Sequence, residues 1–431
     1  MEQTIQQRIA DIQRGDIPAG YRKTKLGIIP ADWSTPELNS VLTENKERNR
    51  SGRFGKEDVL SVSGEFGVTN QIELLGRSFA GASVKDYHIV EAGNIVYTKS
   101  PLKDNPYGII KLNKGNAGIV STLYAVYCCK SNEVGTYLDY YFSLDQNVNN
   151  YLRPLVRKGT KNDMKINNGD VLKGCVILPP ESETAKIVEI LGCCDRVIAL
   201  KKELIAEKKK QKKALMQKLL NPDSGFRLPG FSGEWKKTTI GESGTFVKGK
   251  GIQNSQCTSV GFPCVKYGDI YMKYNISFNA AQSFTSESVF SESLQITSGA
   301  LLFTCSGEDP LEIGKCVLYS GSDYIAVGGD IIVMHPNESI SPDFLVHQQY
   351  SDDLIKQKSA LGKGNSIVHI HLPEIKSLKI SLPPTIKEQQ AIADILSAAD
   401  KEIDLLEQEL VQQEQKKKSL MQLLLTGIVR V

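Results

Sequence analysis

The stretch KKALMQKLL, from Lys212 to Leu220, recurs as KKSLMQLLL, from Lys417 to Leu425. Every residue of the first copy lies 205 positions before its counterpart in the second copy. A self-match at a fixed offset is typical of an internal repeat. These nine residues therefore predict one helix end that is written twice, half a chain apart.

The match continues toward the N-terminus from both copies. ILPPESETAKIVEILGCCDRVI, residues 177–198, aligns with SLPPTIKEQQAIADILSAADKEI, residues 381–403, when one residue is added before the helix. The diprolines Pro179-Pro180 and Pro383-Pro384 stop the segments before them, because proline cannot continue a helix or a central strand. The repeat thus spans a diproline and a complete long helix.

Weaker matches precede each helix in the same order. AGNIVYTKS, residues 92–100, resembles SGALLFTCS, residues 298–306. The pairs VSTLYAV and VGGDIIV, and GYR before Trp33 and GFR before Trp235, follow at offsets between 202 and 207. Their common order predicts a duplicated unit of about half the chain.

Each predicted unit has a strand-rich part and a long helix. Residues 20–175 and 225–380 alternate short apolar runs such as NIVYT and LLFTC with Gly, Asn, Asp and Ser, which predicts strands and turns. We therefore expect an α+β fold with two duplicated, strand-rich domains and two long helices. The expected boundaries are 1–178 for the first domain with an N-terminal helix, 179–224 for the first long helix, 225–382 for the second domain and 383–431 for the second long helix.

Apolar residues on both long helices recur at alternating steps of three and four, as in a coiled coil. Lysines interrupt this stripe at positions 201, 208, 212 and 417, where their stems can cover apolar neighbours. The apolar members are Ile187, Leu191, Ile198, Ile205, Leu215, Leu219, Ile392, Leu396, Ile403, Leu406, Leu410, Leu420 and Leu424.

Two interpretations of this stripe are open. Each helix could pack on its own domain, or the two could pair with each other. At ~1.5 Å per residue, roughly 37 residues span ~55 Å, which exceeds the width of a small domain and favours pairing. Centred antiparallel pairing predicts that facing residue numbers add to 611, so that Lys201 faces Leu410 and Lys212 faces Ala399.

Composition sets broad limits. The 431 residues exceed one usual core, and 52 Lys and Arg against 49 Asp and Glu give a net charge of only +3. Nine cysteines without a C-x-x-C pair favour reduced thiols rather than a disulfide or zinc framework. The start lacks the apolar core of a signal peptide, and we expect a cytoplasmic protein.

Several catalytic motifs begin and then fail. GTFVKGKG, residues 244–251, has Gly251 where a phosphate loop needs Ser or Thr. DNPYG, residues 104–108, lacks a second proline and an upstream cofactor loop, and Glu312 and Lys315 are spaced wrongly for a nuclease strand. His369 and His371 have no nearby carboxylate or thiol cluster. We expect no catalytic residue and no metal site.

Three loops instead collect residues that suit nucleic acid: residues 97–108, 151–170 and 357–373. Lysine and arginine neutralise phosphates, asparagine can bond adenine, and glycine permits close backbone approach. A solvated surface is the alternative interpretation of such loops. The candidate DNA-binding residues are Lys99, Ser100, Lys103, Asn105, Arg153, Arg157, Lys158, Lys161, Asn162, Lys363, Asn365 and His369.

The chain resembles the specificity subunits of type I restriction-modification systems over its whole length. The resemblance rests on ILPP and SLPP, on I-L-x-x-x-D at Ile190 and Ile395, and on the doubled nine-residue motif. It implies that two target recognition domains each read one half of a gapped DNA sequence. It also implies an antiparallel coiled-coil spacer that holds two modification subunits, with restriction and motor subunits joining them.

The same resemblance implies that S-adenosylmethionine, ATP and Mg²⁺ are used by partner subunits, with no cofactor bound by this chain. Glu183-Thr184-Ala185 departs from Glu388-Gln389-Gln390 in the second helix, which leaves partner contact at that end open. Two alternatives remain: a specificity subunit that serves methylation only, and a coiled-coil scaffold that joins two protein-binding domains.

Overall fold

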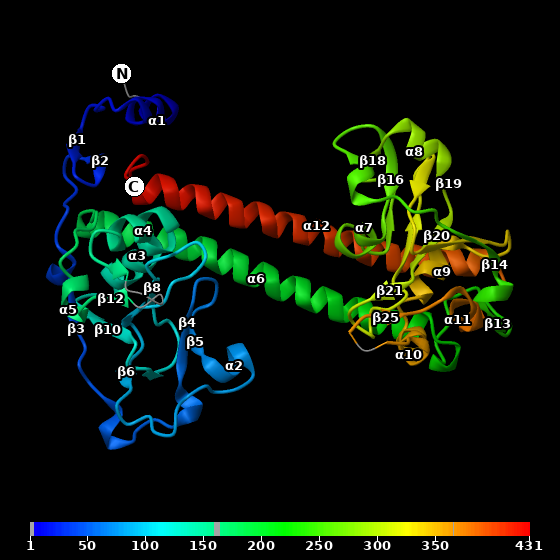
Figure 1. Ribbon diagram of the computed structural model, residues 1–431, viewed down its shortest axis with the longest axis horizontal. Coiled ribbons are helices and arrows are strands. Elements are labelled where there is room, and N and C mark those ends of the chain that lie inside the picture. Colours follow the sequence, from blue (N-terminus) through cyan, green and yellow to red (C-terminus); the bar gives the residue numbers. More distant parts are fainter. Residues whose placement is uncertain (1–3, 159–163, 365) are drawn as a thin grey trace. The chain divides into compact units, whose positions relative to one another are not determined.

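The computed structural model describes residues 4–158, 164–364 and 366–431. They form two compact units: unit 1 is Met1–Lys201 with Glu409–Val431, and unit 2 is Lys202–Gln408. Each unit contains a strand-rich domain and half of each long helix, α6 (Glu181–Leu219) and α12 (Ile386–Leu425). Both long helices can be followed in Figure 1, where α6 is green and α12 is orange to red.

Unit 1 is built around an antiparallel sheet of order β3-β10-β7-β8. All four residues of β7 are buried, as expected for a strand covered on both faces. Its strands are β1 (Tyr21–Thr24), β2 (Gly27–Pro30), β3 (Leu42–Glu44), β4 (Leu60–Ser63), β5 (Gly67–Asn70), β6 (His88–Val90), β7 (Ile95–Thr98), β8 (Ile110–Leu112), β9 (Gly118–Val120), β10 (Tyr124–Cys129), β11 (Arg157–Lys158) and β12 (Met164–Lys165). Its shorter helices are α1 (Ile5–Arg14), α2 (Gln71–Leu75), α3 (Asn132–Ser143), α4 (Asp145–Leu152) and α5 (Asn168–Val171).

Unit 2 contains two five-stranded sheets, β14-β24-β20-β22-β17 and β15-β18-β16-β23-β19. Its strands are β13 (Lys236–Thr239), β14 (Gly244–Lys248), β15 (Cys257–Thr258), β16 (Phe262–Val265), β17 (Ser277–Phe278), β18 (Ser283–Thr285), β19 (Leu294–Ile296), β20 (Ala300–Thr304), β21 (Ser306–Gly307), β22 (Cys316–Tyr319), β23 (Ile325–Val327), β24 (Ile331–Pro336), β25 (Val368–His369) and β26 (Lys379–Leu382). Its shorter helices are α7 (Tyr267–Met272), α8 (Glu287–Glu292), α9 (Pro342–Gln348), α10 (Asp352–Leu361) and α11 (Leu372–Ser377).

The central sheets of the two units share one strand order. β14-β24-β20-β22 follows the same antiparallel sequence of neighbours as β3-β10-β7-β8. Likewise, β19 pairs with β23 as β6 pairs with β9. Equivalent strands begin 202 to 207 residues apart, the same offsets as in the sequence repeat.

Within each unit, ion pairs show that α6 and α12 run antiparallel. Lys417 pairs with Asp195 and Lys201 with Glu409 in unit 1. Lys208 pairs with Glu402 and Lys212 with Asp400 in unit 2. The two residue numbers of each pair add to 610 or 612, one unit from the predicted 611. The sequence stripe did not indicate these flanking acidic partners.

Both interpretations of the apolar stripe apply, at different places along the helices. Near the helix ends, the stripe packs into domain cores: Ile187, Leu191 and Leu424 in unit 1, and Leu219, Ile392 and Leu396 in unit 2. Away from the ends, Ile205 and Ile403 are buried, whereas Ile198, Leu406, Leu410 and Leu420 are half-buried.

Leu215 departs from the predicted stripe, because it is 36% exposed. Met216 packs instead against the core of unit 2, together with buried Leu219 and Leu220. A straight helix has 3.6 residues per turn and drifts relative to a strict heptad. The inward face has therefore moved by one residue where α6 meets its domain.

One aspartate in each unit links both long helices to the domain, and we call each group a clamp. In unit 1, Asp195 of α6 accepts from Lys417 of α12 and, at 2.7 Å, from the Tyr140 hydroxyl of α3. In unit 2, Asp400 of α12 accepts from Lys212 of α6 and lies 3.6 Å from Nδ1 of His347 in α9. The two clamps use equivalent positions crosswise, since 195 and 212 precede 400 and 417 by 205.

The ring of His347 also lies 3.0 Å from the Ser397 hydroxyl through Nε2. Burial lowers the pKa of His347 to about 3, and Lys212 lowers it further, so the ring is neutral at ordinary pH. Burial raises the pKa of Asp400, while Lys212 opposes that shift. The charge balance of this clamp is therefore carried by Lys212 and Asp400.

Candidate nucleic-acid interface

The sheet topology gathers several loops at one end of each central sheet, which we call the loop end. Because neighbouring strands are antiparallel, β3 and β7 finish where β10 and β8 begin. In unit 2, β14 and β20 finish where β24 and β22 begin. The loops that follow β7 and β20 start at Lys99 and Cys305.

In unit 1, the structure brings two of the predicted basic loops together. Lys99 Nζ donates to Asn168 Oδ1 at 2.6 Å, and Asn168 Nδ2 donates to Glu44 Oε1 at 2.9 Å. Burial lowers the pKa of Lys99, and Glu44 opposes that shift. Lys99 therefore holds the loops together, whereas Ser100 and Lys103 are exposed and free to face a ligand.

Asn105 is positioned as a structural residue rather than at the surface. Its side chain is 6% exposed, and Nδ2 donates to Asp145 Oδ1 at 2.6 Å at the start of α4. Nearby, Asn149 Nδ2 donates to the carbonyl of Asp104 at 3.0 Å. These bonds fix the loop after β7 against α4, and we do not retain Asn105 as a base contact.

Arg153 and Arg157 are exposed at the end of α4 and in β11. β11 pairs with β12, where Met164 Sδ lies 3.9 Å from the Tyr97 hydroxyl of β7. The two arginines thus belong to the same cluster of loops as Lys103. Of the other candidates, Lys161, Asn162 and the side chain of Lys158 lie outside the described residues.

In unit 2, the predicted loop 357–373 meets the loop after β20. β21 and β25 pair Ser306 with His369, whose Nδ1 lies 3.0 Å from the Ser306 hydroxyl. Lys363 is exposed and its Nζ lies 3.0 Å from Glu374 Oε1. Asn365 lies outside the described residues. Within the described part of the chain, no group of three or more His, Cys, Asp or Glu side chains is arranged to hold a metal ion.

Basic residues after the first strand of each sheet also reach the loop end, and sequence reasoning missed them. Lys46 follows β3 with its side chain 81% exposed, and exposed Lys250 follows β14. The signal was present in GTFVKGKG, which we had considered only as a phosphate loop. Its glycines serve packing, because a Cβ on Gly249 would lie 2.1 Å from the carbonyl oxygen of Gly328.

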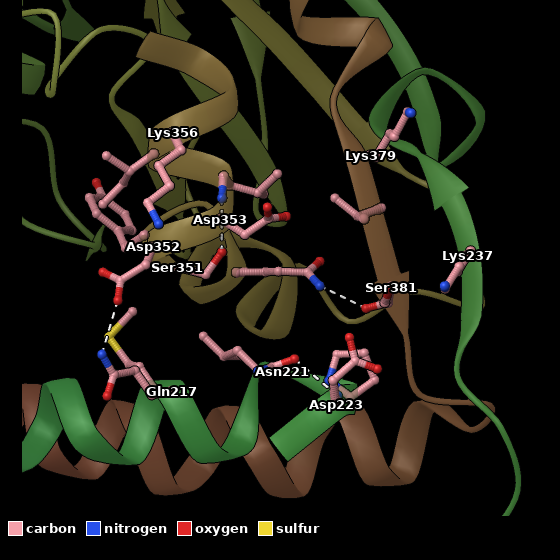
Figure 2. Close-up of a pocket in the computed structure, with 18 of the residues that line it drawn as sticks. Gln217, Asn221, Asp223, Lys237, Ser351, Asp352, Asp353, Lys356, Lys379 and Ser381 are labelled. Atoms are coloured by element: carbon pink, nitrogen blue, oxygen red, sulfur yellow. Dashed lines mark hydrogen bonds between the residues drawn. The ribbon is translucent and has the colours of Figure 1, made fainter. Parts of the chain in front are cut away.

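A separate groove of 1190 Å³ lies in unit 2 between the end of α6, the start of α10 and strands β13 and β26. Figure 2 shows Gln217 of α6 joined to Asp352 of α10, with Lys237 and Lys379 on the neighbouring strands. Lysines and aspartates alternate around it, and none of the predicted DNA-binding residues lines it. The groove is thus distinct from the loop end.

The doubled motif supplies matching side chains to a groove in each unit. Lys213, Met216 and Gln217 line the groove of unit 2. Lys418, Met421 and Gln422 are their counterparts at an offset of 205, and they line a groove of 1090 Å³ in unit 1. Lys213 and Gln217 are exposed, so packing alone does not require the same residues in both copies.

Comparison with known proteins agrees with this arrangement. Residues 232–415 match the family described as type I restriction modification DNA specificity domain. The class defined by fold and site is thus that of DNA specificity proteins. The chain belongs to the specificity subunits of type I restriction-modification systems.

Two relatives come from Methanocaldococcus jannaschii. The chain is 28% identical to the type I restriction enzyme MjaVIII specificity subunit over 268 residues, which cover 59% of this chain and 62% of that protein. It is 25% identical to the MjaX specificity subunit over 445 residues, which cover 95% and 97%.

Two solved structures share the fold. A chain from a structure on complex assembly and conformational transition of the type I R-M system matches with a TM-score of 0.53 and 15% identity, covering 93% of this chain and 99% of that one. The type I restriction-modification S subunit from M. genitalium matches with a TM-score of 0.55 and 15% identity, covering 91% and 96%.

Proposed function

We propose that this chain directs a type I restriction-modification complex to a bipartite, gapped DNA target. Each strand-rich domain would read one half-site through its loop end, and the paired helices would act as the spacer. The observation that carries this proposal is the shared strand order of the two central sheets, each presenting exposed basic residues at the same end. Two domains of one fold with different loop residues are suited to reading two different half-sites.

The partners follow from the same proposal. The grooves that contain Lys213 with Gln217 and Lys418 with Gln422 give two equivalent surfaces, which suits two copies of one partner. We propose that these copies are the modification subunits, and that restriction and motor subunits join them. S-adenosylmethionine, ATP and Mg²⁺ would bind those partners, and the complex would work on DNA in the cytoplasm. No helix among the described residues combines the length and apolarity needed to cross a membrane.

The purified chain alone is expected neither to methylate nor to cut DNA. Its sequence contains none of the complete cofactor, phosphate or nuclease motifs that such chemistry requires. Incubation with labelled S-adenosylmethionine and DNA should transfer no label until modification subunits are added. Transfer by the chain alone would contradict the proposal.

Replacing Lys103, Arg153 and Arg157 with alanine should weaken binding of the chain with its modification subunits to all DNA sequences. These residues are exposed in one loop cluster, so each removes one phosphate contact, and the salt dependence should fall by about one unit of slope per contact. Affinity measured between low and moderate salt checks this. Lys25, exposed in the β1–β2 turn, is the matched control. An unchanged slope would remove this cluster from the DNA surface.

Methylome sequencing with the gene present or deleted tests the function as a whole. Loss of one gapped adenine motif on deletion would support it. A specificity subunit that serves methylation only would give the same result without a copurifying restriction subunit. Failure to retain DNA even with partner subunits would instead favour a coiled-coil scaffold.

A further inference from the structure

Asp330 has an unusual backbone at the loop end of unit 2. With φ of 60°, it has the only positive φ of a residue other than glycine in residues 4–158, 164–364 and 366–431. Aspartate tolerates this left-handed region better than most residues, although at some cost in free energy. Such strain persists only where the surrounding structure fixes it, and it often marks a functional position.

The surroundings of Asp330 do fix it. Its carbonyl accepts from the backbone N–H of Cys305 at 3.0 Å, directly after the pairing of Thr304 with Ile331. The preceding Gly329 packs against Gly251, because a Cβ there would lie 3.1 Å from the Gly251 Cα. The turn before β24 is thereby held between the loops that follow β14 and β20.

The carboxylate of Asp330 is exposed in a neighbourhood of basic and polar groups. Burial raises the pKa of Cys305 to about 11, Lys248 lowers it and Asp330 raises it, so both charges act on this thiol. Cys305 is followed by Ser306, which bonds His369. Among the described residues, no cation lies within ion-pairing distance of the Asp330 carboxylate. An unpaired negative charge on a phosphate-binding surface is unfavourable unless it contacts something other than phosphate.

The equivalent position in unit 1 is Leu123. It directly precedes β10 as Asp330 precedes β24, and it lies beside Lys99 as Asp330 lies beside Cys305. Leu123 is 65% exposed. One position of the loop end therefore carries a solvent-facing carboxylate in one unit and a solvent-facing apolar side chain in the other, which packing does not explain.

The geometry points to Asp330 as a specificity-determining residue that accepts a hydrogen bond from the exocyclic amino group of a base in the half-site read by unit 2. This inference rests on the proposed function. A carboxylate accepts but cannot donate, so it favours cytosine N4 or adenine N6 over guanine and thymine in the major groove. Cytosine is the better match, because adenine also presents N7, which needs a donor.

Two variants keep the backbone and change only the chemistry. Asparagine tolerates a positive φ and has both a donor and an acceptor, so Asp330→Asn should admit adenine at the affected position. Glycine favours this backbone and has no side chain, so Asp330→Gly should relax the position to several bases. Asp323→Asn is the matched control, since Asp323 is exposed at the opposite end of the sheet and contributes only its carbonyl, to the Tyr319 hydroxyl at 2.7 Å.

The experiment is methylome sequencing of cells that express the full chain, or each variant, with its modification subunits. We expect a change of about 10-fold or more in preference at one base of one half-site, with the other half-site and the gap unchanged. If a variant methylates too little to map, binding of the purified complex to targets that vary each base replaces it. An unchanged motif, or a uniform loss over all bases, would overturn the inference. Absence of any gapped motif with the wild-type chain would instead contradict the proposed function itself.

Discussion

A chain that ends at Leu220 is expected to pair with itself and, together with modification subunits, to direct methylation of a palindromic gapped site. Helix α6 contains both charged members of a clamp, Asp195 and Lys212, whose counterparts in α12 are Asp400 and Lys417. In a twofold dimer, Asp195 of each copy can therefore meet Lys212 of the other. The dimer would contain two copies of the first domain, and so it would read one half-site twice.

Light scattering of the fragment and methylome sequencing of a strain that expresses it provide the measurements. Lys212→Glu should abolish pairing, because each of two attractive contacts becomes a repulsion with Asp195, weakening the dimer by at least about tenfold. Lys213→Glu is the matched control, since that neighbour is 68% exposed and faces away from the clamp. A fragment that stays monomeric at tens of micromolar, without palindromic methylation, would show that the two long helices are not equivalent.

The sequence was sufficient to predict the long helices and their register, because both depend on a regular pattern. The apolar stripe predicted a facing sum of 611, and the four ion pairs have sums of 610 or 612. The exposed Leu215 shows the limit of this reasoning. Where a helix leaves its partner and enters a domain core, tertiary packing and not the heptad decides which face turns inward.

The loop residues were harder to assign, because composition does not distinguish a surface contact from an internal bond. Asn105 and Lys99 have the residue types of DNA contacts, yet their side chains bond Asp145 and Asn168 within unit 1. Asp330 was not identified, since an acidic residue does not fit a search for basic patches and its backbone strain leaves no trace in sequence. Only strand topology places it among the basic loops.

The repeat itself was misleading at one arginine. Arg22 and Arg227 occupy matching places ahead of Trp33 and Trp235. However, Arg227 binds Glu388 at the start of α12, whereas Arg22 donates to the carbonyl of Trp33 at 2.6 Å. In unit 1, Arg430 instead binds the equivalent Glu183 at the start of α6. The same ion pair is thus made by residues that no linear alignment of the two halves would match.

This difference leads to the largest stability change that we expect from a single substitution, Arg227→Ala. Glu388 is 1% exposed, and its two oxygens accept from Arg227 Nε at 2.8 Å and Nη2 at 2.7 Å. Removing the guanidinium would leave a buried carboxylate unpaired, which costs roughly 3–5 kcal/mol of unfolding free energy. Arg22→Ala removes only a bond to a carbonyl and should cost about 1 kcal/mol.

Denaturant unfolding of full-length chains can resolve these effects by unit, because Trp33 lies in unit 1 and Trp235 in unit 2. Replacing Trp33 with phenylalanine leaves Trp235, which packs edge-on to Phe344 with ring centroids 6.0 Å apart, as the fluorescent reporter of unit 2. Adding Glu388→Gln to Arg227→Ala should recover part of the loss, since a neutral amide replaces the stranded charge. If Arg227→Ala cost no more than Arg22→Ala, or if Glu388→Gln recovered nothing, the burial of an unpaired carboxylate could not be what makes this arginine important.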